Sequence, residues 1–137
     1  KDNMEEGFEN AKTKTLEYIN KHIKVADELK KPLVLEEFGF PRDHHSFEIN
    51  SSTKLRDQYY DAILQLWNNN KNKNGSFAGT AFWAYGGISK PIPGQIFWKK
   101  GDDFMGDPLI VYQGLNAVFN TDTSTWDTIQ KYSETLK

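Results

Sequence analysis

The sequence predicts an α/β fold with a parallel sheet. Amphipathic helical patterns alternate with two continuous apolar runs of strand length, and residues that favour turns separate them. Continuous apolar runs are typical of strands buried on both faces, as in a parallel sheet covered by helices. A chain of 137 residues is long enough for one domain with its own core.

The composition excludes several classes of protein. The net charge is only −2 and comes from interspersed Lys, Asp and Glu, so no basic face for nucleic acid is predicted. No run approaches the roughly 18 apolar residues of a membrane span. Cysteine is absent, which excludes disulfides and thiolate zinc sites. Aromatic residues make up 14% of the chain, which suits an ordinary core and also suits stacking on sugar faces.

The first element is a helix predicted over residues 8–30. Its apolar residues recur at spacings of three and four, and they are Leu16, Ile19, Ile23, Ala26 and Leu29. We expect this stripe to face the core and the charged residues to face solvent.

The next element is a buried strand that begins near Pro32 and ends in two adjacent carboxylates, Glu36 and Glu37. Ionised groups are costly to bury unless they are paired or used. The pair therefore has two readings, a salt bridge at the rim of the sheet or a catalytic carboxylate. In parallel α/β proteins functional groups gather at the carboxyl ends of the strands, which is where this pair lies. Because side chains alternate along a strand, we expect only one of the two to face inward.

A polar loop over residues 40–47 follows and carries His44 and His45. No third ligand stands at metal spacing nearby, so no metal site is predicted. Ser51–Thr53 offers an N-cap for a second helix. The apolar stripe of that helix is Leu55, Tyr59, Ala62, Ile63 and Leu66.

A second buried strand is predicted over residues 78–85, ending in Gly86-Gly87. The stretch from Ile88 to Leu109 is too long and irregular for a plain connection, and long loops of this kind usually bind something. A closing helix is predicted from a capping box formed by Ser124 and Asp127. Its apolar face comprises Trp126, Ile129, Tyr132 and Leu136.

Three motifs together resemble glycoside hydrolase family 5, and within it the endo-β-1,4-mannanases. Leu35-Glu36-Glu37-Phe38-Gly39 is similar to the strand-seven nucleophile motif of retaining glycosidases, and Phe77–Gly87 is similar to the strand-eight motif. Further on, Gln113-Gly114-Leu115-Asn116 and Val118-Phe119 match the segment before the last helix. Leu109 to Tyr112 depart from the proline-rich, partly acidic run that is usual there.

The resemblance implies that residues 1–137 are the C-terminal portion of a (β/α)8 TIM barrel, containing strands seven and eight with their flanking helices. Such a barrel needs about 250 residues, so the N-terminal portion of the domain is expected to be absent. The chain begins at Lys1 rather than at a methionine, which fits that expectation.

The resemblance also implies the site residues. Glu37 is the expected catalytic nucleophile and Glu36 a rim residue, while Trp83 is the expected aromatic floor beneath the sugar. The other expected substrate-binding residues are His44, Phe97 and Trp98. In members of the family the acid/base glutamate lies near the end of strand four, before the segment that this chain resembles. This chain is therefore expected to be catalytically incomplete.

The expected activity of the parent protein is retaining, endo-acting hydrolysis of β-1,4-mannosidic bonds in mannan, glucomannan or galactomannan, with no cofactor. The expected partner is a β-mannan polysaccharide or oligosaccharide, and the expected location is extracellular, cell-surface or periplasmic. Two alternatives remain open: a β-1,4-glucanase of the same clan, and a non-catalytic carbohydrate-binding fragment. The three helical patterns disfavour the usual β-sandwich of a binding module.

Overall fold

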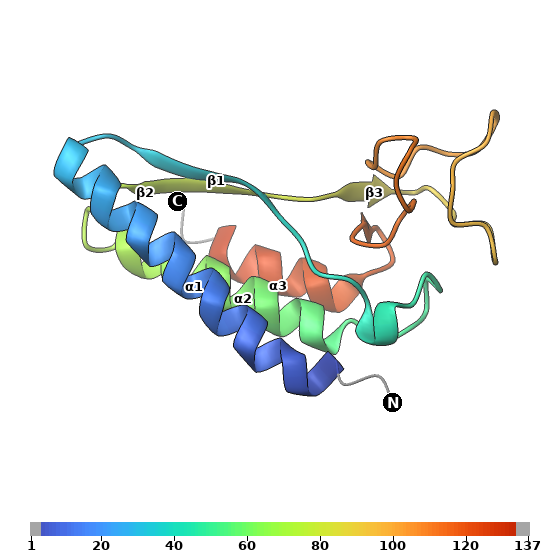
Figure 1. Cartoon of the computed structure of the whole chain (residues 1–137), viewed down its shortest axis with the longest axis horizontal. Helices are drawn as coiled ribbons and strands as arrows, with labels where there is room; N and C mark the ends of the chain where they lie inside the picture. The colour runs from blue at the N-terminus through green and yellow to red at the C-terminus, as the bar shows by residue number, and fades with distance from the viewer. Residues whose placement is uncertain (1–3, 134–137) are drawn as a thin grey trace.

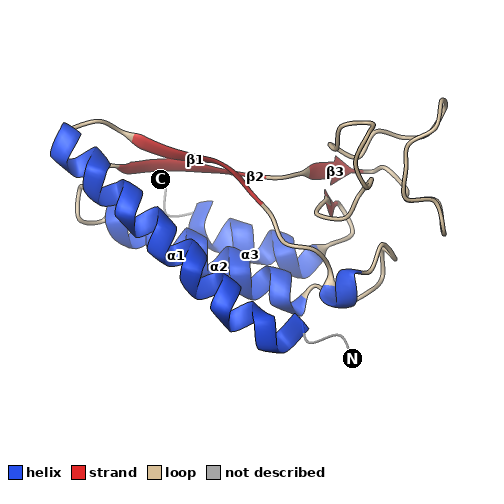
Figure 2. Cartoon of the chain, in the orientation of Figure 1, coloured by secondary structure: helices blue, strands red, loops and turns tan. Residues whose placement is uncertain are grey.

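Helices and strands alternate along the chain, and the helices lie on one side of two long parallel strands (Figures 1 and 2). The computed structural model describes residues 4–133. Over these residues the elements are α1 (Met4–Leu29), β1 (Leu33–Phe38), a 3-10 turn η1 (Asp43–His45), α2 (Lys54–Lys71), β2 (Phe77–Phe82), β3 (Tyr85–Gly87), β4 (Val118–Phe119) and α3 (Thr123–Ser133). The predicted order of helices and strands is confirmed, and the stretch from Ile88 to Leu109 contains neither helix nor strand.

The parallel pair at the centre of the fold is β1 and β2, joined through α2. Leu33 is aligned with Phe77, and Phe38 is aligned with Phe82 at the other end of the pair. This arrangement confirms the prediction that the two buried runs are adjacent and parallel. Among residues 4–133 each of these strands pairs with one neighbour only, so the other edge of each strand has no strand partner.

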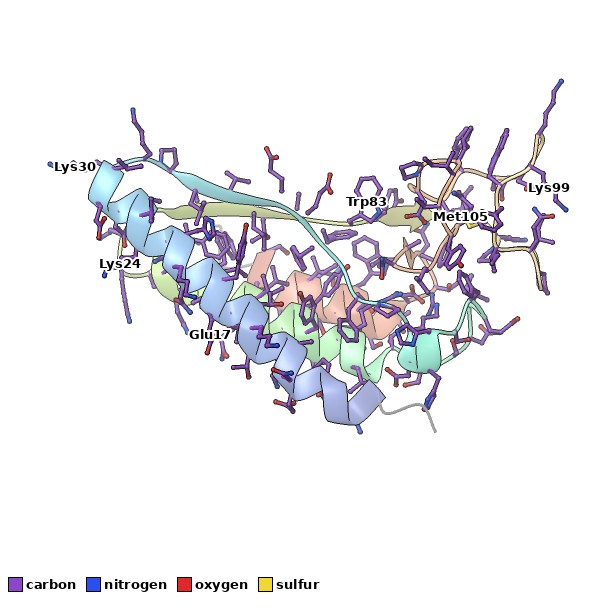
Figure 3. The ribbon with its side chains drawn as sticks, in the orientation of Figure 1. Glu17, Lys24, Lys30, Trp83, Lys99 and Met105 are labelled. Carbon is purple, nitrogen blue, oxygen red and sulfur yellow. The ribbon has the colours of Figure 1, made fainter. Side chains whose placement is uncertain are left out.

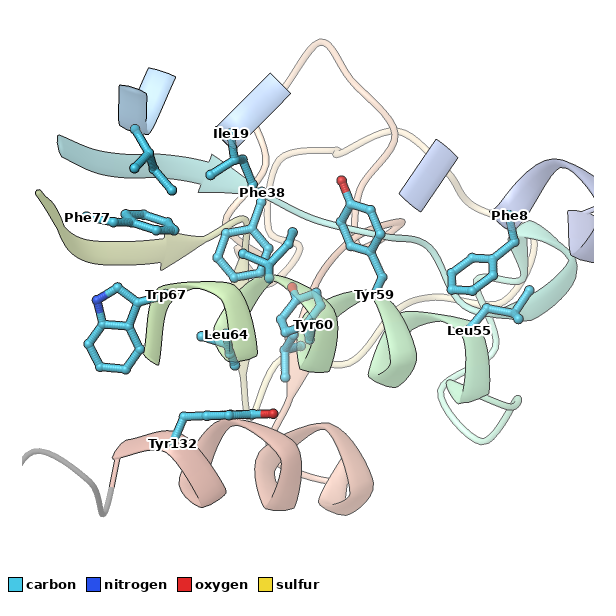
Figure 4. Packing of buried hydrophobic residues seen from close by; sticks show 13 residues of the cluster. Phe8, Ile19, Phe38, Leu55, Tyr59, Tyr60, Leu64, Trp67, Phe77 and Tyr132 are labelled. Atoms are coloured by element: carbon cyan, nitrogen blue, oxygen red, sulfur yellow. The ribbon is translucent and has the colours of Figure 1, made fainter. Parts of the chain in front are cut away.

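The core lies between this sheet and the helices (Figure 4). The ring of Phe38 on β1 packs at 4.9 Å from the ring of Tyr60 on α2, and α3 covers the far side of α2 with Tyr132. The predicted stripes are largely confirmed, because Ile19, Ile23, Ala26, Leu55, Tyr59 and Ile63 are all buried. The first stripe ends earlier than predicted.

Leu29 was predicted to face the core as the last member of that stripe, but it is exposed. It belongs to the last turn of α1, and the chain leaves the helix at Lys30 with a positive φ of 52°. Figure 3 shows Lys30 at the outer tip of the helix, beyond the packed elements. The periodicity therefore runs one turn further than the surface available to bury it.

The predicted second strand is two strands with different partners. β2 pairs with β1, whereas β3 pairs with β4 in a separate parallel sheet. The break falls at Trp83 and Ala84, whose peptide bond is cis. Beyond it the amide of Val118 donates to the carbonyl of Ala84 at 2.8 Å. The apolar run is continuous in sequence, but its hydrogen-bond partners change near its end, at Trp83 and Ala84.

The helix caps agree with the prediction only in part. Thr53, within the predicted Ser51–Thr53 segment, is the N-cap residue of α2, but its side chain makes no capping hydrogen bond. At the start of α2, the backbone amide of Leu55 donates to the Asp43 carboxylate at 3.0 Å, and Ser52 Oγ accepts from the amide of Lys54 at 3.3 Å. The capping box predicted at Ser124 is wrong: α3 already begins at Thr123, and Ser124 Oγ instead contacts Thr53 Oγ1 at 3.0 Å. Leu136, predicted for the apolar face of this helix, lies outside the described residues.

Candidate active site

The carboxyl ends of β1 and β2 are tied together by one backbone hydrogen bond. The amide of Trp83 donates to the carbonyl of Phe38 at 2.7 Å. This bond sets the end of the Glu36-Glu37 strand directly beside the end of the strand that leads into Trp83. The adjoining Gly39 has no side chain to separate them, and a Cβ atom there would collide with the backbone carbonyl of Trp83.

The two glutamates lie on an irregular part of β1. Leu35 and Phe38 both pack against the core although they are three residues apart, and the pairing register with β2 shifts between them. One extra residue of β1 is accommodated between these two inward-packing positions, so the pairing with β2 is irregular across Glu36 and Glu37, and which of the two faces inward stays a prediction. Irregularities of this kind re-aim side chains and are frequent next to active sites.

The environments of the two glutamates nevertheless differ. Glu36 lines a hollow of about 260 Å³ between β1 and α1, together with Tyr18 and His22. Glu37 is exposed and precedes Phe38, whose side chain is buried on the helix side.

Trp83 is held by a carboxylate that the sequence did not single out. Its indole Nε1–H donates to Asp107 Oδ1 at 3.0 Å, and the other oxygen, Oδ2, accepts from the backbone amide of Gly114 at 2.7 Å. Asp107 is buried. Figure 3 shows Trp83 where the long strand gives way to β3, close to the loop that carries Met105. The ring is thereby oriented at the strand end.

A hollow of about 480 Å³ opens beside the Trp83 ring. Phe97 and Tyr112 form one side of it, with their ring centroids 5.3 Å apart in an edge-to-face arrangement. Phe97, from the long irregular loop, therefore shares this hollow with Trp83. The strand end and the loop thus build one concave site from segments that lie apart in the sequence.

Two of the predicted binding residues lie elsewhere. Trp98 stacks on Phe104 with a centroid distance of 5.5 Å, and its Nε1–H donates to the carbonyl of Asp102 at 3.1 Å. His44 sits in η1 with a positive φ of 58°. Neither residue lines the hollow beside Trp83, whereas His45 lines a separate one of about 360 Å³.

A buried cluster of charged residues, Arg42, Arg56 and Asp122, lies next to the strand ends on the helix side. One terminal nitrogen of Arg42 lies 2.7 Å from each carboxylate oxygen of Asp122, and Arg56 reaches Asp122 Oδ2 at 3.3 Å. Arg56 also donates to the carbonyls of Phe40 at 2.8 Å and Ala117 at 3.0 Å. Burial lowers the pKa of Arg56, and the nearby positive charge of Arg42 lowers it further. The cluster joins the chain after β1 to α2 and to the chain around β4.

Sequence reasoning missed this cluster because its members are far apart and look like surface residues. Arg42 and Asp122 are separated by 80 residues. Arginine and aspartate are almost never fully buried unless they are paired, so a single arginine in a polar loop gives no sign of burial. The only local signal is the position of Arg42 directly after the strand that carries the glutamates.

Between residues 4 and 133, no group of three or more His, Cys, Asp or Glu side chains is arranged to hold a metal ion. Nor does any helix in that range have the length and apolar character needed to cross a bilayer.

Comparisons with known proteins place these features in context. The family model described as "GH family 5 beta-mannosidase-like" matches residues 1–137. A search of curated protein sequences finds no significant match.

Several solved structures are similar. A glycoside hydrolase family 5 mannosidase from Rhizomucor miehei superposes with a TM-score of 0.82 at 28% identity, covering 95% of this chain and 32% of that one. A glutamate-to-alanine variant of that mannosidase in complex with mannosyl-fructose gives a TM-score of 0.80 at 26% identity, covering 94% of this chain and 32% of that one. This chain therefore spans about a third of the length of the structures that it matches.

Proposed function

Because the chain belongs to the β-mannosidase-like group of glycoside hydrolase family 5, we propose that it is part of a retaining hydrolase of β-mannosidic bonds. It matches a mannosidase over 32% of that protein's length, which supports reading it as part of a (β/α)8 barrel. The motifs at Leu35–Gly39 and Phe77–Gly87 are the reason for our proposal that this part holds strands seven and eight. The expected extracellular or periplasmic location remains part of this proposal.

The observation that carries the proposal is the hydrogen bond between the Phe38 carbonyl and the Trp83 amide. It sets a glutamate and an aromatic ring at adjacent strand ends, where a retaining glycosidase can use the carboxylate as its nucleophile and the ring as a support for the sugar. Glu37 would attack the anomeric carbon from one face of the sugar ring. Trp83 would stack beneath the apolar face of the same ring.

The reaction needs a second carboxyl group. Retaining glycosidases place it about 5–5.5 Å from the nucleophile, where it first protonates the leaving oxygen and then activates water. We assign that role to a residue outside residues 1–137, in the part of the complete protein that corresponds to the uncovered length of the matched mannosidases. Each such proton transfer is commonly worth about 10²–10⁴-fold in rate, so residues 1–137 alone should not hydrolyse β-mannosides measurably.

The test compares Glu37→Ala with Glu36→Ala in the complete protein. Glu37→Ala should abolish turnover of a β-mannoside, whereas Glu36→Ala should leave substantial activity in an equally stable protein. Product analysis by NMR should show retention at the anomeric carbon. Equal loss from the two substitutions, or inversion at the anomeric carbon, would reject Glu37 as the nucleophile.

Two modes of attack are distinguished by their products. Endo-acting cleavage of β-1,4-mannan is supported by the agreement of Gln113–Asn116 and Val118-Phe119 with the mannanase segment. Exo-acting release of single mannose units is the second candidate, and the β-mannosidase-like description of the family favours it. An endo-enzyme lowers the viscosity of mannan before much mannose appears, and an exo-enzyme does the reverse.

A further inference from the structure

The indole of Trp83 meets two different surroundings. Its Nε1–H donates to Asp107 Oδ1 at 3.0 Å, while the ring lines the hollow at the strand end. Trp83 is half-buried, and Asp107 is only 7% exposed. A sugar stacked on this ring would therefore contact one part of the indole while a buried carboxylate contacts another.

The carboxylate of Asp107 is also fixed by bonds that do not involve the ring. Its other oxygen, Oδ2, accepts from the amide of Gly114 at 2.7 Å. The side-chain amide of Gln113 closes the turn after Asp107 by donating to the carbonyl of Pro108 at 2.8 Å. These bonds hold the carboxylate in place without help from a ligand, so the orientation of the Trp83 ring is set before a sugar binds.

A carboxylate bonded to an indole N–H changes the electrostatics of the ring as well as its position. Its negative charge polarises the N–H bond and moves electron density into the ring, because hydrogen-bonded groups polarise one another in a low-dielectric site. The face of an indole already attracts cations, since it is the negative part of the ring quadrupole. Asp107 therefore makes the face of Trp83 more attractive to positive charge than an indole without this partner.

Positive charge develops on the sugar during the proposed reaction. The transition state of glycoside hydrolysis resembles an oxocarbenium ion, whereas the bound substrate is neutral. An interaction that is stronger in the transition state than in the ground state raises kcat instead of only lowering KM. A negatively polarised ring beneath the sugar acts in this way, because the charge that it attracts appears only in the transition state.

We infer that Asp107 is a positioning residue that acts through Trp83, holding the indole and strengthening its attraction for the cationic transition state. The inference rests on the proposed function, which places the sugar on Trp83. The carboxylate exerts this effect through the indole and not through a bond to the sugar. Its influence should therefore appear mainly in kcat and in the binding of cationic sugar mimics.

Calorimetry on the complete protein tests the inference with two probes. One is a mannose-configured isofagomine, whose protonated ring nitrogen replaces the anomeric carbon, and the other is the neutral methyl β-D-mannoside. Asp107→Asn should weaken binding of the cationic probe about fivefold more than binding of the neutral probe. It should also lower kcat for a β-mannoside about tenfold while KM changes less than about threefold. A ring that is only loosened would bind both probes less well by the same factor, so an unchanged affinity ratio would overturn the inference.

A second substitution at the same position separates the charge from the hydrogen bond. The hydroxyl of Asp107→Ser can accept from the indole but carries no negative charge. This variant should lower the affinity ratio as Asp107→Asn does, and it keeps the test decisive if Asp107→Asn fails to fold. Asp103→Asn is the matched control, because Asp103 is an exposed carboxylate of the same loop, and its affinity ratio should equal that of the wild type.

A double-variant cycle shows whether the effect passes through the indole. Trp83→Phe keeps a flat ring but removes the N–H donor. In that background Asp107→Asn should no longer change the affinity ratio of the two probes. An equally large change there would overturn the inference, because the carboxylate would then act without the indole.

Activity of the complete protein separates this inference from the proposed function. Hydrolysis of β-mannosides together with an affinity ratio that ignores the charge of Asp107 would overturn the inference and leave the proposed function standing. A complete protein that neither binds the probes nor hydrolyses β-mannosides would reject the proposed function, and the inference would fall with it.

Discussion

Replacing Asp122 by alanine should destabilise the protein more than an alanine substitution of any other charged residue between residues 4 and 133. The carboxylate accepts from Arg42, Arg56 and the backbone amide of Phe119. Arg42 is 1% exposed, Arg56 0% and Asp122 5%, so water cannot replace the missing partner. The substitution removes the carboxylate that both buried guanidinium groups contact.

The magnitude follows from the partners that remain. Arg56 keeps the carbonyls of Phe40, Ala117 and Leu115 as acceptors. Arg42 keeps only the carbonyl of Ser51, at 3.5 Å. Removing one partner of a buried ion pair costs about 3–5 kcal/mol, and we expect Asp122→Ala to reach that range chiefly through Arg42.

Urea unfolding followed by tryptophan fluorescence and by circular dichroism measures this change. Glu9→Ala is the matched control, because Glu9 pairs with Lys12 at 2.8 Å on the exposed side of α1 and should cost about 1 kcal/mol or less. Equal slopes of the unfolding curves would show that the compared states have not changed.

A second substitution checks the cause. If uncompensated charge is responsible, then adding Arg42→Met to Asp122→Ala should recover about 1 kcal/mol or more, since one of the two unpaired cations is removed. A cost for Asp122→Ala no larger than that of Glu9→Ala, or a double variant whose costs simply add, would refute the reasoning.

Three further predictions concern single residues. Asp107→Asn should loosen Trp83, because an amide NH2 would face an N–H donor; faster hydrogen exchange of the indole N–H should reveal this, and exposed Asp103→Asn should leave that rate unchanged. Gly39→Ala should cost about 2 kcal/mol in urea unfolding, since its Cβ would meet the Trp83 carbonyl, and a cost below about 0.5 kcal/mol would contradict the close approach. Burial would raise the pKa of Asp61, but hydrogen bonds from α3 hold that pKa below its ordinary value of 3.8. Its stabilisation should therefore be present above pH 3.8 and be lost as the pH falls through the lowered folded value, so a stability difference between wild type and Asp61→Asn that persists at lower pH would contradict it.

The sequence was sufficient for the parallel pair and for the helix between its strands. Those elements could be predicted because the apolar residues of each recur with the period of a helix or form a continuous strand-length run. The strand break after Phe82 could not be predicted in the same way. The apolar run continues to Tyr85, and only the position of the distant segment at Ala117–Phe119 decides where the hydrogen-bond partner changes.

The candidate site was predictable in part for a related reason. Glu37 and Trp83 belong to motifs that are recognisable in one dimension, and the structure brings their strand ends together through the Phe38 carbonyl. Asp107 is a different case, because an acidic residue between glycine and proline is ordinary turn chemistry. Its partner indole lies 24 residues earlier in the chain, and no pattern in the sequence joins the two.

Around the strand ends, the buried cluster and the hollow should differ in how well they tolerate amino-acid substitutions. Arg56 grips the carbonyl of Phe40 after β1 and that of Ala117 before β4, so it holds the strand-end backbone from the helix side. The hollow is built mainly from the loop residues around Phe97 and Ile110, and Arg56 touches its lining through the carbonyl of Leu115, to which it donates at 3.3 Å. Substitutions of loop residues other than Asp107 can therefore reshape the hollow while Arg56 still holds the strand-end backbone. Substitutions in the cluster would disturb Glu37 and Trp83 whatever the loop contains.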